Sequence, residues 1–196
     1  MKRIFDFIVS FLTLLFFIPF GLAIVFFIIM DSGFPVFFRQ TRIGRNGAEF
    51  RLYKFRSMSV LKSAEKGSFD AGDTMRVTKV GRILRKSKLD ELPQLLNVLK
   101  GDMSIVGPRP EVEQWVRTYP ARWALVHKLK PGITDNASIE FRNEEELLAE
   151  SKSPLETYKD DILPRKLDLY EDYVKNHSLG IDLQIIFRTI KVVLHK

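Results

Sequence analysis

The sequence predicts an α+β fold that is mainly helical, with an N-terminal membrane helix followed by one small cytosolic domain. Three observations support this prediction. Residues 7–30 contain no charged residue and are almost entirely apolar. Residues 36–55 contain two aromatic runs around an Asn-Gly pair, a pattern typical of a short β-hairpin. Most of the remaining chain has apolar residues at helical spacing. We therefore place residues 1–35 in the membrane and residues 36–196 in the cytosolic domain.

The composition excludes several classes of function. The chain has 196 residues, of which 45% are hydrophobic, so one domain with a sizeable core is expected. It contains no cysteine, which excludes disulfides, iron–sulfur clusters and cysteine nucleophiles. The three histidines, His127, His177 and His195, are scattered along the chain, so a histidine metal site is not expected.

The apolar run is long enough to form a membrane helix. As an α-helix, residues 7–30 would be about 36 Å long, and the hydrocarbon core of a bilayer is about 30 Å thick. A cleaved signal peptide has a shorter apolar run and small residues at its cleavage site, and residues 31–34 do not provide such a site. Pro19 lies in the middle of the run and cannot donate a backbone hydrogen bond, so we expect the helix to kink or break there.

The charges around this run predict how it lies in the membrane. Lys2 and Arg3 precede the run, and Arg39, Arg42 and Arg45 follow it. Basic flanking residues favour the cytoplasmic side of a membrane, so both flanks prefer the same side. A re-entrant helix, broken at Pro19, enters and leaves one leaflet and satisfies both flanks. An ordinary kinked span remains the alternative.

The cytosolic domain is expected to begin with the hairpin and to continue as helices. Residues 36–38 and 50–55 are β-prone, and Asn46-Gly47 between them favours a tight turn. Residues 59–75 are rich in Ser, Lys, Gly and Asp, and we expect a mobile loop there. The apolar spacing predicts helices over residues 80–84, 92–99 (ended by Gly101), 111–129, 143–150 and 165–176.

The last segment, Ile181–Lys196, has the pattern of an amphipathic helix, with Asp182 away from the centre of its apolar face. The apolar face comprises Leu183, Ile186, Phe187, Ile190, Val193 and Leu194. Such a helix can pack against a core, or it can lie at a membrane interface. Both alternatives stand.

The positive charge is concentrated in the middle of the chain. The whole protein carries a net charge of +7, and residues 36–109 hold 16 Lys and Arg against 7 Asp and Glu. A basic region of this kind attracts phosphates, whether on nucleic acid, on lipid head groups or on a nucleotide.

Two adjacent carboxylates in this basic region are the best candidates for chemistry. Asp90 and Glu91 stand at the expected start of a helix, with Pro93 in its first turn. Four cations precede them: Arg82, Arg85, Lys86 and Lys88. In a metal–diphosphate site, carboxylates hold Mg²⁺ and arginines hold the phosphate oxygens. The alternative is a solvated helix start without function, which these residues taken alone favour.

Two proline-containing loops follow the carboxylates. Arg109 lies between Pro108 and Pro110, which would present its guanidinium in a fixed direction. A rigid arginine suits the recognition of a phosphate or of a planar base. Residues 130–134, Lys-Pro-Gly-Ile-Thr, form a similar loop. For both loops the alternative is a simple turn between two elements.

Together, these stretches resemble the small monotopic phosphoglycosyl transferases, a family of bacterial sugar transferases. The resemblance covers essentially the whole chain in the expected order, through residues 2–6, 42–47, 53–58, 89–99, 101–104, 106–111 and 131–134. The most specific part is Leu89–Gln94 together with Gly107–Pro110. Many members follow the Pro-Gly-Ile-Thr loop with Gly-Trp, whereas this chain has Asp135-Asn136-Ala137-Ser138. That loop therefore gives no indication of the substrate.

The resemblance implies a reaction and a location. The family transfers a sugar-1-phosphate from a UDP-sugar to undecaprenyl phosphate and releases UMP, as the first membrane step of a polysaccharide or glycoprotein pathway. It uses Mg²⁺ and a covalent phosphosugar–enzyme intermediate. The implied location is the bacterial inner (cytoplasmic) membrane, with the catalytic domain facing the cytoplasm.

The resemblance also implies roles for individual residues. Asp90 would be the nucleophile, and Glu91 would be its partner in removing a proton or in binding metal, so both are candidate Mg²⁺ ligands. Arg85 would hold a phosphate. The nucleotide site would be shaped by Pro108, Arg109 and Pro110.

The implied partners are a UDP-sugar, undecaprenyl phosphate and membrane lipid, without nucleic acid, and a homo-oligomer is compatible with the sequence. Two rival hypotheses remain. A membrane-anchored nucleic-acid-binding module would use the basic middle region, but the carboxylate pair there would repel a phosphate backbone. A membrane scaffold that holds a partner through its C-terminal helix would leave Asp90 without a role. The sequence identifies neither the sugar nor the pathway.

Overall fold

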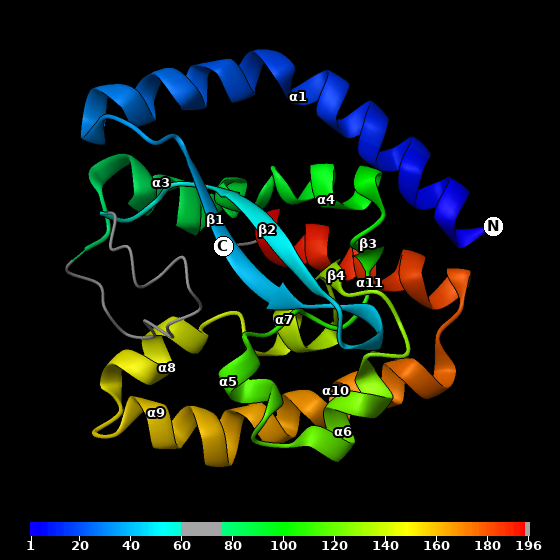
Figure 1. Cartoon of the computed structure of the whole chain (residues 1–196). Coiled ribbons are helices and arrows are strands. Elements are labelled where there is room, and N and C mark those ends of the chain that lie inside the picture. The colour runs from blue at the N-terminus through cyan, green and yellow to red at the C-terminus, as the bar shows by residue number, and fades with distance from the viewer. Residues whose placement is uncertain (60–75, 195–196) are drawn as a thin grey trace.

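The computed structural model describes residues 1–59 and 76–194, and this part of the chain is mainly helical (Figure 1). A long helix, α1 (Lys2–Ser32), arches over the other elements. The predicted fold class is confirmed in its coarse form, with mainly helices, one short hairpin and one long apolar N-terminal helix. Apart from Ser59, the loop expected over residues 59–75 lies outside the described residues.

The hairpin forms where the aromatic runs predict it. Strands β1 (Phe37–Ile43) and β2 (Glu49–Phe55) pair antiparallel, and Phe37 lies opposite Phe55. Asn46 and Gly47 take left-handed backbone angles, with φ of 59° and 75°, between the two strands. These are the residue types that adopt such angles most readily, so the tight turn forms as predicted.

Two helices follow the hairpin as the apolar spacing predicts. Helix α3 (Lys79–Ser87) begins at Thr78, whose Oγ1 accepts a hydrogen bond from the Gly81 nitrogen at 2.9 Å. Helix α4 (Gln94–Lys100) ends at Gly101, which has φ of 95°. The side-chain cap at one end and the left-handed glycine at the other explain where these helices begin and end.

The prediction of one helix over residues 111–129 is wrong. The segment forms α5 (Glu113–Val116) and α6 (Pro120–Val126), because Pro120 cannot continue a helix and instead starts a new one. The remaining helices are α7 (Asn136–Glu140), α8 (Glu144–Glu150), α9 (Pro154–Thr157), a π-helical turn (Tyr158–Ile162), α10 (Leu163–Asn176) and α11 (Leu179–Leu194). The helices expected over residues 143–150 and 165–176 are thus present.

The largest core cluster lies among these later helices. It is built around Trp115, Trp123, Tyr158 and Leu167, all of which are buried. A separate cluster joins α1 to the domain, where Ile24 and Ile28 pack with Phe55 and Leu84. This cluster packs α1 onto the domain near the C-terminal end of the helix. Burying a side chain such as Ile28 contributes roughly 2 kcal/mol to stability.

The Pro-Gly-Ile-Thr stretch is a strand, which corrects the expectation of a simple loop. Strand β4 (Gly132–Thr134) pairs in parallel with β3 (Ser104–Val106). The two strands are too short to show any alternating pattern in the sequence, and they form because distant segments meet in the fold. The pairing places the loop after β3 directly against β4.

Of the kink or break predicted at Pro19, the break is wrong, because helix α1 continues through this residue. It runs from Lys2 to Ser32 with Pro19 inside, and its axis curves along its length (Figure 1). A proline removes one backbone hydrogen bond and crowds the preceding turn, which bends a helix without requiring it to end. Among the described helices, α1 alone is long and apolar enough to cross a membrane, with a mean hydropathy of 2.8.

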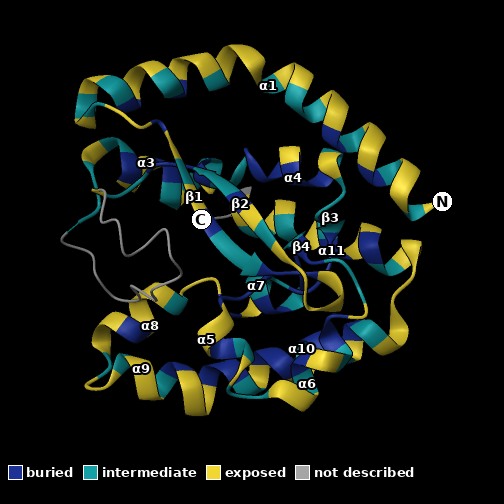
Figure 2. Cartoon of the chain, viewed as in Figure 1, coloured by how far each residue is buried: buried dark blue, intermediate teal, exposed yellow. Residues whose placement is uncertain are grey.

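Both ends of α1 are fixed to the same domain. At the N-terminal end, Arg3 donates to the Leu99 carbonyl at 2.8 Å, and the carboxylate of buried Asp6 accepts from Ser104 Oγ at 2.8 Å. At the other end, Arg56 donates to the Gly33 carbonyl at 2.6 Å. Between these anchors, most of the large apolar side chains of α1 are exposed (Figure 2).

Helix α11 packs against the domain, which is one of the two alternatives that the sequence left open, and its interfacial role stays a prediction. Ile185 is buried against the domain, while Phe187 and Ile190 are exposed. Asp182 lies away from the exposed apolar side, as expected, but it is buried and forms an ion pair with Lys2 at the start of α1. The first turn of α11 is therefore tied to the N-terminal end of α1.

Candidate active site

Asp90 and Glu91 lie on the short connection between α3 and α4. Lys88 takes a left-handed conformation, with φ of 57°, and ends α3. Residues Leu89–Glu91 then form a single 3₁₀ turn before α4 begins at Gln94. The helix start predicted at the carboxylate pair is therefore a tight turn placed immediately before the helix.

Buried Asn97 fixes α4 against the hairpin. Its Nδ2 donates to the Arg51 carbonyl at 2.7 Å, and its Oδ1 accepts from the Tyr53 nitrogen at 3.1 Å. Removing a buried amide that binds backbone groups leaves those groups without partners, which costs free energy. This contact therefore fixes the position of α4 on the hairpin. The turn that carries Asp90 and Glu91, immediately before α4, is thereby held in a fixed position relative to β2.

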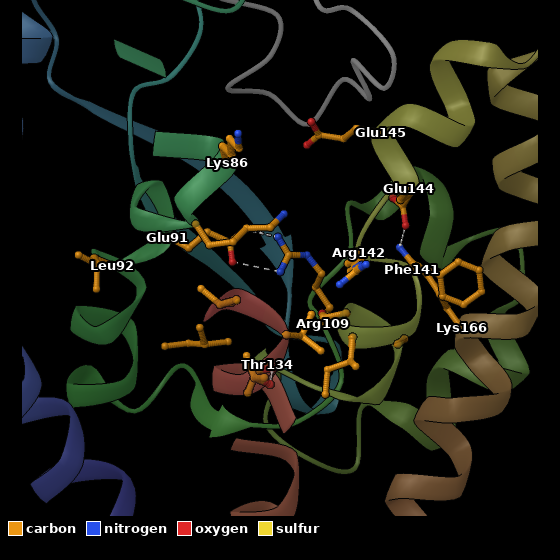
Figure 3. Close-up of a pocket in the computed structure, with 18 of the residues that line it drawn as sticks. Lys86, Glu91, Leu92, Arg109, Thr134, Phe141, Arg142, Glu144, Glu145 and Lys166 are labelled. Atoms are coloured by element: carbon orange, nitrogen blue, oxygen red, sulfur yellow. Dashed lines mark hydrogen bonds and ion pairs between the residues drawn. The ribbon is translucent and has the colours of Figure 1, made fainter. Parts of the chain in front are cut away.

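Glu91 is ionised and carries two cationic partners. Lys54 Nζ donates to its Oε1 at 2.8 Å, and Arg109 donates to both of its carboxylate oxygens. Burial alone would raise the pKa of Glu91, but the charges of Arg109 and Lys54 together hold this pKa well below its usual range. The charge of Glu91 in turn raises the pKa of Arg109. This cluster joins the hairpin, the turn before α4 and the proline-containing loop, and Figure 3 shows its contact between Glu91 and Arg109.

The pKa of Asp90 is shifted in the opposite direction from that of Glu91. The residue is buried, and its Oδ1 accepts no hydrogen bond from any described residue. Burial raises the pKa of the Asp90 carboxyl, while the charge of Lys54 opposes this shift. A desolvated carboxylate with an unshared oxygen is available to attack a phosphorus atom or to bind a cation.

The loop that carries Arg109 is fixed by close backbone contact with β4. The Gly107 nitrogen donates to the Thr134 carbonyl at 3.1 Å, and the Gly132 nitrogen donates to the Pro108 carbonyl at 2.9 Å. A Cβ atom on Gly132 would lie 2.1 Å from the Gly107 nitrogen, so only glycine permits this approach. The two motifs that the sequence presented as separate loops are thus one structural unit.

The far end of the same loop is anchored to β1. Arg42 donates to the Pro110 carbonyl at 3.2 Å and to Glu111 Oε1 at 2.8 Å. Tyr158 donates to the other Glu111 oxygen at 2.8 Å. Pro108 and Pro110 are buried, whereas Arg109 is half-buried between them. The two prolines therefore fix the conformation of the loop. Arg109 is the side chain of this loop that reaches the carboxylate of Glu91.

Arg85 is held away from the carboxylate pair. Its guanidinium forms an ion pair with Glu145 and contacts Met58 Sδ at 3.0 Å. Although its charge is close enough to act on Asp90, Arg85 donates no hydrogen bond to that carboxylate among the contacts of the described residues. The predicted phosphate contact of Arg85 remains a prediction, and it would require Arg85 to leave Glu145.

A cavity of about 360 Å³ adjoins this cluster (Figure 3). Of the residues predicted from the sequence, Glu91 and Arg109 line it, while Asp90, Arg85, Pro108 and Pro110 do not. Asp90 is nevertheless the direct neighbour of Glu91 in the turn. Five cations line the cavity: Lys86, Lys88, Arg109, Arg142 and Lys166.

Sequence reasoning missed two of these cations. Arg142 lies in the turn between α7 and α8, and Lys166 lies on α10, in a stretch that showed only a pattern of apolar spacing. Lys166 is buried and forms an ion pair with Glu144, which also lines the cavity (Figure 3). No sequence motif marks either residue, because the two reach the cavity only when α10 packs on α7 in the folded chain.

The carboxylates provide a partial fit to a divalent metal ion. Within the described residues there is no group of three or more carboxylate, histidine or cysteine ligands. Mg²⁺ is commonly held by one or two carboxylates together with substrate phosphates and water. Asp90, with its unshared buried oxygen, fits that role. Glu91 holds Lys54 and Arg109 with both of its oxygens, so its predicted metal contact would require an exchange of partners.

Comparison with known proteins gives a consistent result. The family described as bacterial sugar transferase matches residues 1–196. A UDP-N-acetylgalactosamine-undecaprenyl-phosphate N-acetylgalactosaminephosphotransferase of Aeromonas hydrophila is 37% identical, over 98% of this chain and 43% of that protein. A UDP-glucose:undecaprenyl-phosphate glucose-1-phosphate transferase of Klebsiella pneumoniae is 41% identical, over 96% of this chain and 39% of that protein.

A third relative is more similar to this chain in length. The uncharacterized sugar transferase EpsL of Bacillus subtilis is 42% identical, over 84% of this chain and 73% of that protein. The chain therefore spans less than half the length of the Aeromonas and Klebsiella relatives and matches most of the Bacillus protein.

Proposed function

This chain belongs to the bacterial sugar transferase family, and from that membership we propose that it transfers a sugar-1-phosphate from a UDP-sugar to undecaprenyl phosphate. The products are undecaprenyl-diphospho-sugar and UMP. The observation that carries this proposal is the pair of adjacent carboxylates, one desolvated with an unshared oxygen and the other paired with Arg109 and Lys54. The names of the relatives support the substrate classes.

In the first half-reaction, a carboxylate oxygen of Asp90 attacks the phosphorus that bears the sugar. A phosphorus–oxygen bond to Asp90 forms, and the bond between this phosphorus and the bridging oxygen of the diphosphate breaks. UMP leaves with that oxygen. The raised pKa of Asp90 supports this role, because a more basic carboxylate is a better nucleophile once it is ionised.

In the second half-reaction, a phosphate oxygen of the lipid attacks the same phosphorus. The new phosphorus–oxygen bond completes the lipid diphosphate, and the bond to Asp90 breaks and regenerates the free carboxylate. The acceptor phosphate already carries negative charge, so this step needs a cationic surrounding more than a strong base.

Arg109 and the lysines of the cavity provide that surrounding. Arg109 can hold two phosphate oxygens in its planar fork, and Lys86 and Lys88 line the same cavity. The lowered pKa of Glu91 makes this carboxylate a weak base at neutral pH. We therefore assign Glu91 chiefly to holding Arg109 and Lys54 beside the reacting phosphorus, rather than to removing a proton.

We propose Mg²⁺ as the cofactor, with Asp90 as the protein ligand that fits best. When bound, the metal would neutralise charge on the diphosphate of the donor. Glu91 would become a second ligand only by releasing one of its cations, and the neighbouring Lys54 would then remain to balance the charge of Asp90.

We also propose that α1 is re-entrant and that the domain faces the cytoplasm at the inner membrane. The two ends of α1 bind the same domain through Arg3 and Asp6 at one end and Arg56 at the other. A straight span would separate these ends by the thickness of the bilayer, so its ends could not both contact one domain. The middle of the curved helix, whose exposed residues Figure 2 shows, would then enter one leaflet.

The proposal is tested by incubating the purified, detergent-solubilised protein with a panel of UDP-sugars, undecaprenyl phosphate and Mg²⁺. Release of UMP that depends on the lipid, together with a lipid-linked sugar diphosphate of the expected mass, supports the function. Release of UDP instead of UMP would show a glycosyl transfer and contradict it. The panel also identifies the sugar.

A further inference from the structure

We propose that the cavity contains a lipid slot, formed between α1, α4 and α11, that binds the first isoprenoid units of the acceptor. The inference rests on the proposed function in one respect, since it takes the acceptor to be a polyprenyl phosphate. It adds where this lipid binds and which side chains contact it.

The wall of the cavity has two chemical characters. Cations and carboxylates line one part, and Figure 3 shows Lys86, Glu144 and Glu145 together on one side. In the same view, Thr134 lies below Arg109, and Leu92 lies at the left, beyond Glu91. The apolar part of the lining comprises Leu92, Leu95, Ile133, Ile139, Val192 and Val193.

The apolar part reaches the membrane helix. Thr13, in the middle of α1, lines the cavity. Its neighbours Leu12 and Phe16 are 57% and 67% exposed and belong to the surface of α1 that is available to lipid. On α11, Val193 lines the cavity and is itself 42% exposed. The apolar wall is therefore continuous with two surfaces that can contact lipid.

The polar end of the slot lies beside the reacting residues. Leu92 directly follows Glu91 in the chain, and Leu95 lies one turn further along the same segment. A phosphate held by Arg109 would thus carry its first isoprenoid units along Leu92 and Leu95 toward α1. A nucleotide sugar is polar throughout and would gain nothing from this wall, whereas a polyprenyl phosphate matches both parts.

Two matched pairs of variants test the slot. Thr13→Phe and Val192→Phe each place a ring in the lining, while Leu12→Phe and Ile190→Phe place the same ring on the exposed face of the same helices. A ring in the lining takes up space that the isoprenoid chain needs, so we expect the KM for undecaprenyl phosphate to rise about tenfold in both lining variants. The controls should keep the KM of the unaltered protein.

The donor half-reaction separates this inference from the proposed function. Without lipid, the lining variants should release the same burst of UMP from the UDP-sugar as the unaltered protein. Loss of that burst in the lining variants would show that the cavity wall serves the donor, and an unchanged KM for the lipid would show that the slot does not bind it. Equal damage in the controls would indicate a general effect on the membrane helices. Each of these three results overturns the inference.

A binding experiment tests the slot without relying on turnover. The protein in detergent is irradiated with a polyprenyl phosphate that carries a photoreactive diazirine on its first isoprenoid units. Label should appear in the peptides that contain Thr13 and Val192, and undecaprenyl phosphate should compete with it more strongly than undecaprenol does. Label confined to the exposed middle of α1, or equal competition by the alcohol, would contradict the slot even if the protein proved to be inactive as a transferase.

Discussion

At the scale of single residues, Asp90 and Glu91 differ because their partners differ. Glu91 balances Arg109 and Lys54, whereas Asp90 is desolvated and keeps one oxygen unshared. Adjacent carboxylates with pKa values moved in opposite directions are typical of sites in which one group reacts and the other organises charge. Burial of Asp90 is therefore a stability cost that its proposed chemistry explains.

The first prediction concerns this cost. Asp90→Asn should reduce turnover by orders of magnitude, because the amide is a poor nucleophile, yet at pH 7.5 it should melt no lower than the unaltered protein. The folded-state pKa of Asp90 is raised above its unfolded value, so the ionised form destabilises the fold at neutral pH. This penalty disappears as the pH falls below the unfolded value.

The measurement is differential scanning fluorimetry of both proteins between pH 7.5 and pH 4. Any melting advantage of Asp90→Asn should narrow toward the acid end. An advantage that widened as the pH fell would contradict the raised pKa of Asp90, and a much lower melting temperature at pH 7.5 would show that this carboxylate stabilises the fold.

The second prediction concerns Arg109. Arg109→Lys keeps the charge but loses the planar fork that reaches both oxygens of Glu91. We expect kcat/KM for the UDP-sugar to fall about tenfold or more, with the melting temperature little changed. Steady-state kinetics measure this, with Arg117→Lys as the control, because Arg117 is exposed and pairs only with Glu113 one turn away among the contacts described. Full activity of Arg109→Lys would reduce Arg109 to a turn residue.

At the scale of elements, the loop of Arg109 and strand β4 act as one unit. The two are joined by hydrogen bonds between Gly107 and Thr134 and between Gly132 and Pro108. Arg109 can reach Glu91 only if this backbone contact is kept. The orientation of one side chain in the site thus depends on a glycine in a strand more than twenty positions away along the chain.

The third prediction follows from that contact. Gly132→Ala should lower stability by roughly 2 kcal/mol or more, because the new Cβ would meet the Gly107 backbone at 2.1 Å. It should also lower kcat/KM by displacing Arg109. Gly180→Ala is the matched control, since the nearest atom to its Cβ would be Ser178 Oγ at 3.9 Å. Chemical denaturation and steady-state kinetics provide both readouts, and equal stability of the two variants would contradict the close approach.

The sequence predicts the elements that have local signals. The Asn46-Gly47 turn, the Gly101 helix end and the apolar run of α1 are found as expected. It does not predict β3 and β4, since three-residue strands show no alternation and pair only through tertiary contact. For the same reason the cavity residues Arg142 and Lys166 could not be found before the packing of the later helices was known.

At the scale of the whole molecule, α1 and the rest of the domain are one packed unit. One end of α1 binds β3, α4 and α11 through Lys2, Arg3 and Asp6. The other end is held by the packing of Ile28 and by the hydrogen bond from Arg56. The exposed apolar surface lies between these anchors. This arrangement would hold the cavity at the level where a lipid phosphate meets water.

The fourth prediction tests this arrangement in cells. The chain has no cysteine, so single cysteines can be labelled without background. One cysteine added ahead of Met1 and one in Phe34→Cys should both resist a membrane-impermeant maleimide in intact cells and react after permeabilisation. Phe34 is 77% exposed, so its cysteine would be accessible to the reagent.

Glu113→Cys, in the domain, provides the reference for a cytoplasmic position. Labelling of the N-terminal cysteine in intact cells, with Phe34→Cys protected, would demonstrate an ordinary span. That result would also contradict the observed docking of both ends of α1 on one domain.

The central claim is that Asp90 becomes covalently attached to the sugar phosphate, and mass spectrometry of the digested protein tests it most directly. The protein is incubated with its UDP-sugar and Mg²⁺ in the absence of lipid, quenched in acid and digested. We predict an added mass equal to the sugar phosphate, located on the peptide that contains Asp90, absent from Asp90→Asn and lost when undecaprenyl phosphate is added. An adduct on another residue, or turnover by Asp90→Asn close to that of the unaltered protein, would contradict the claim.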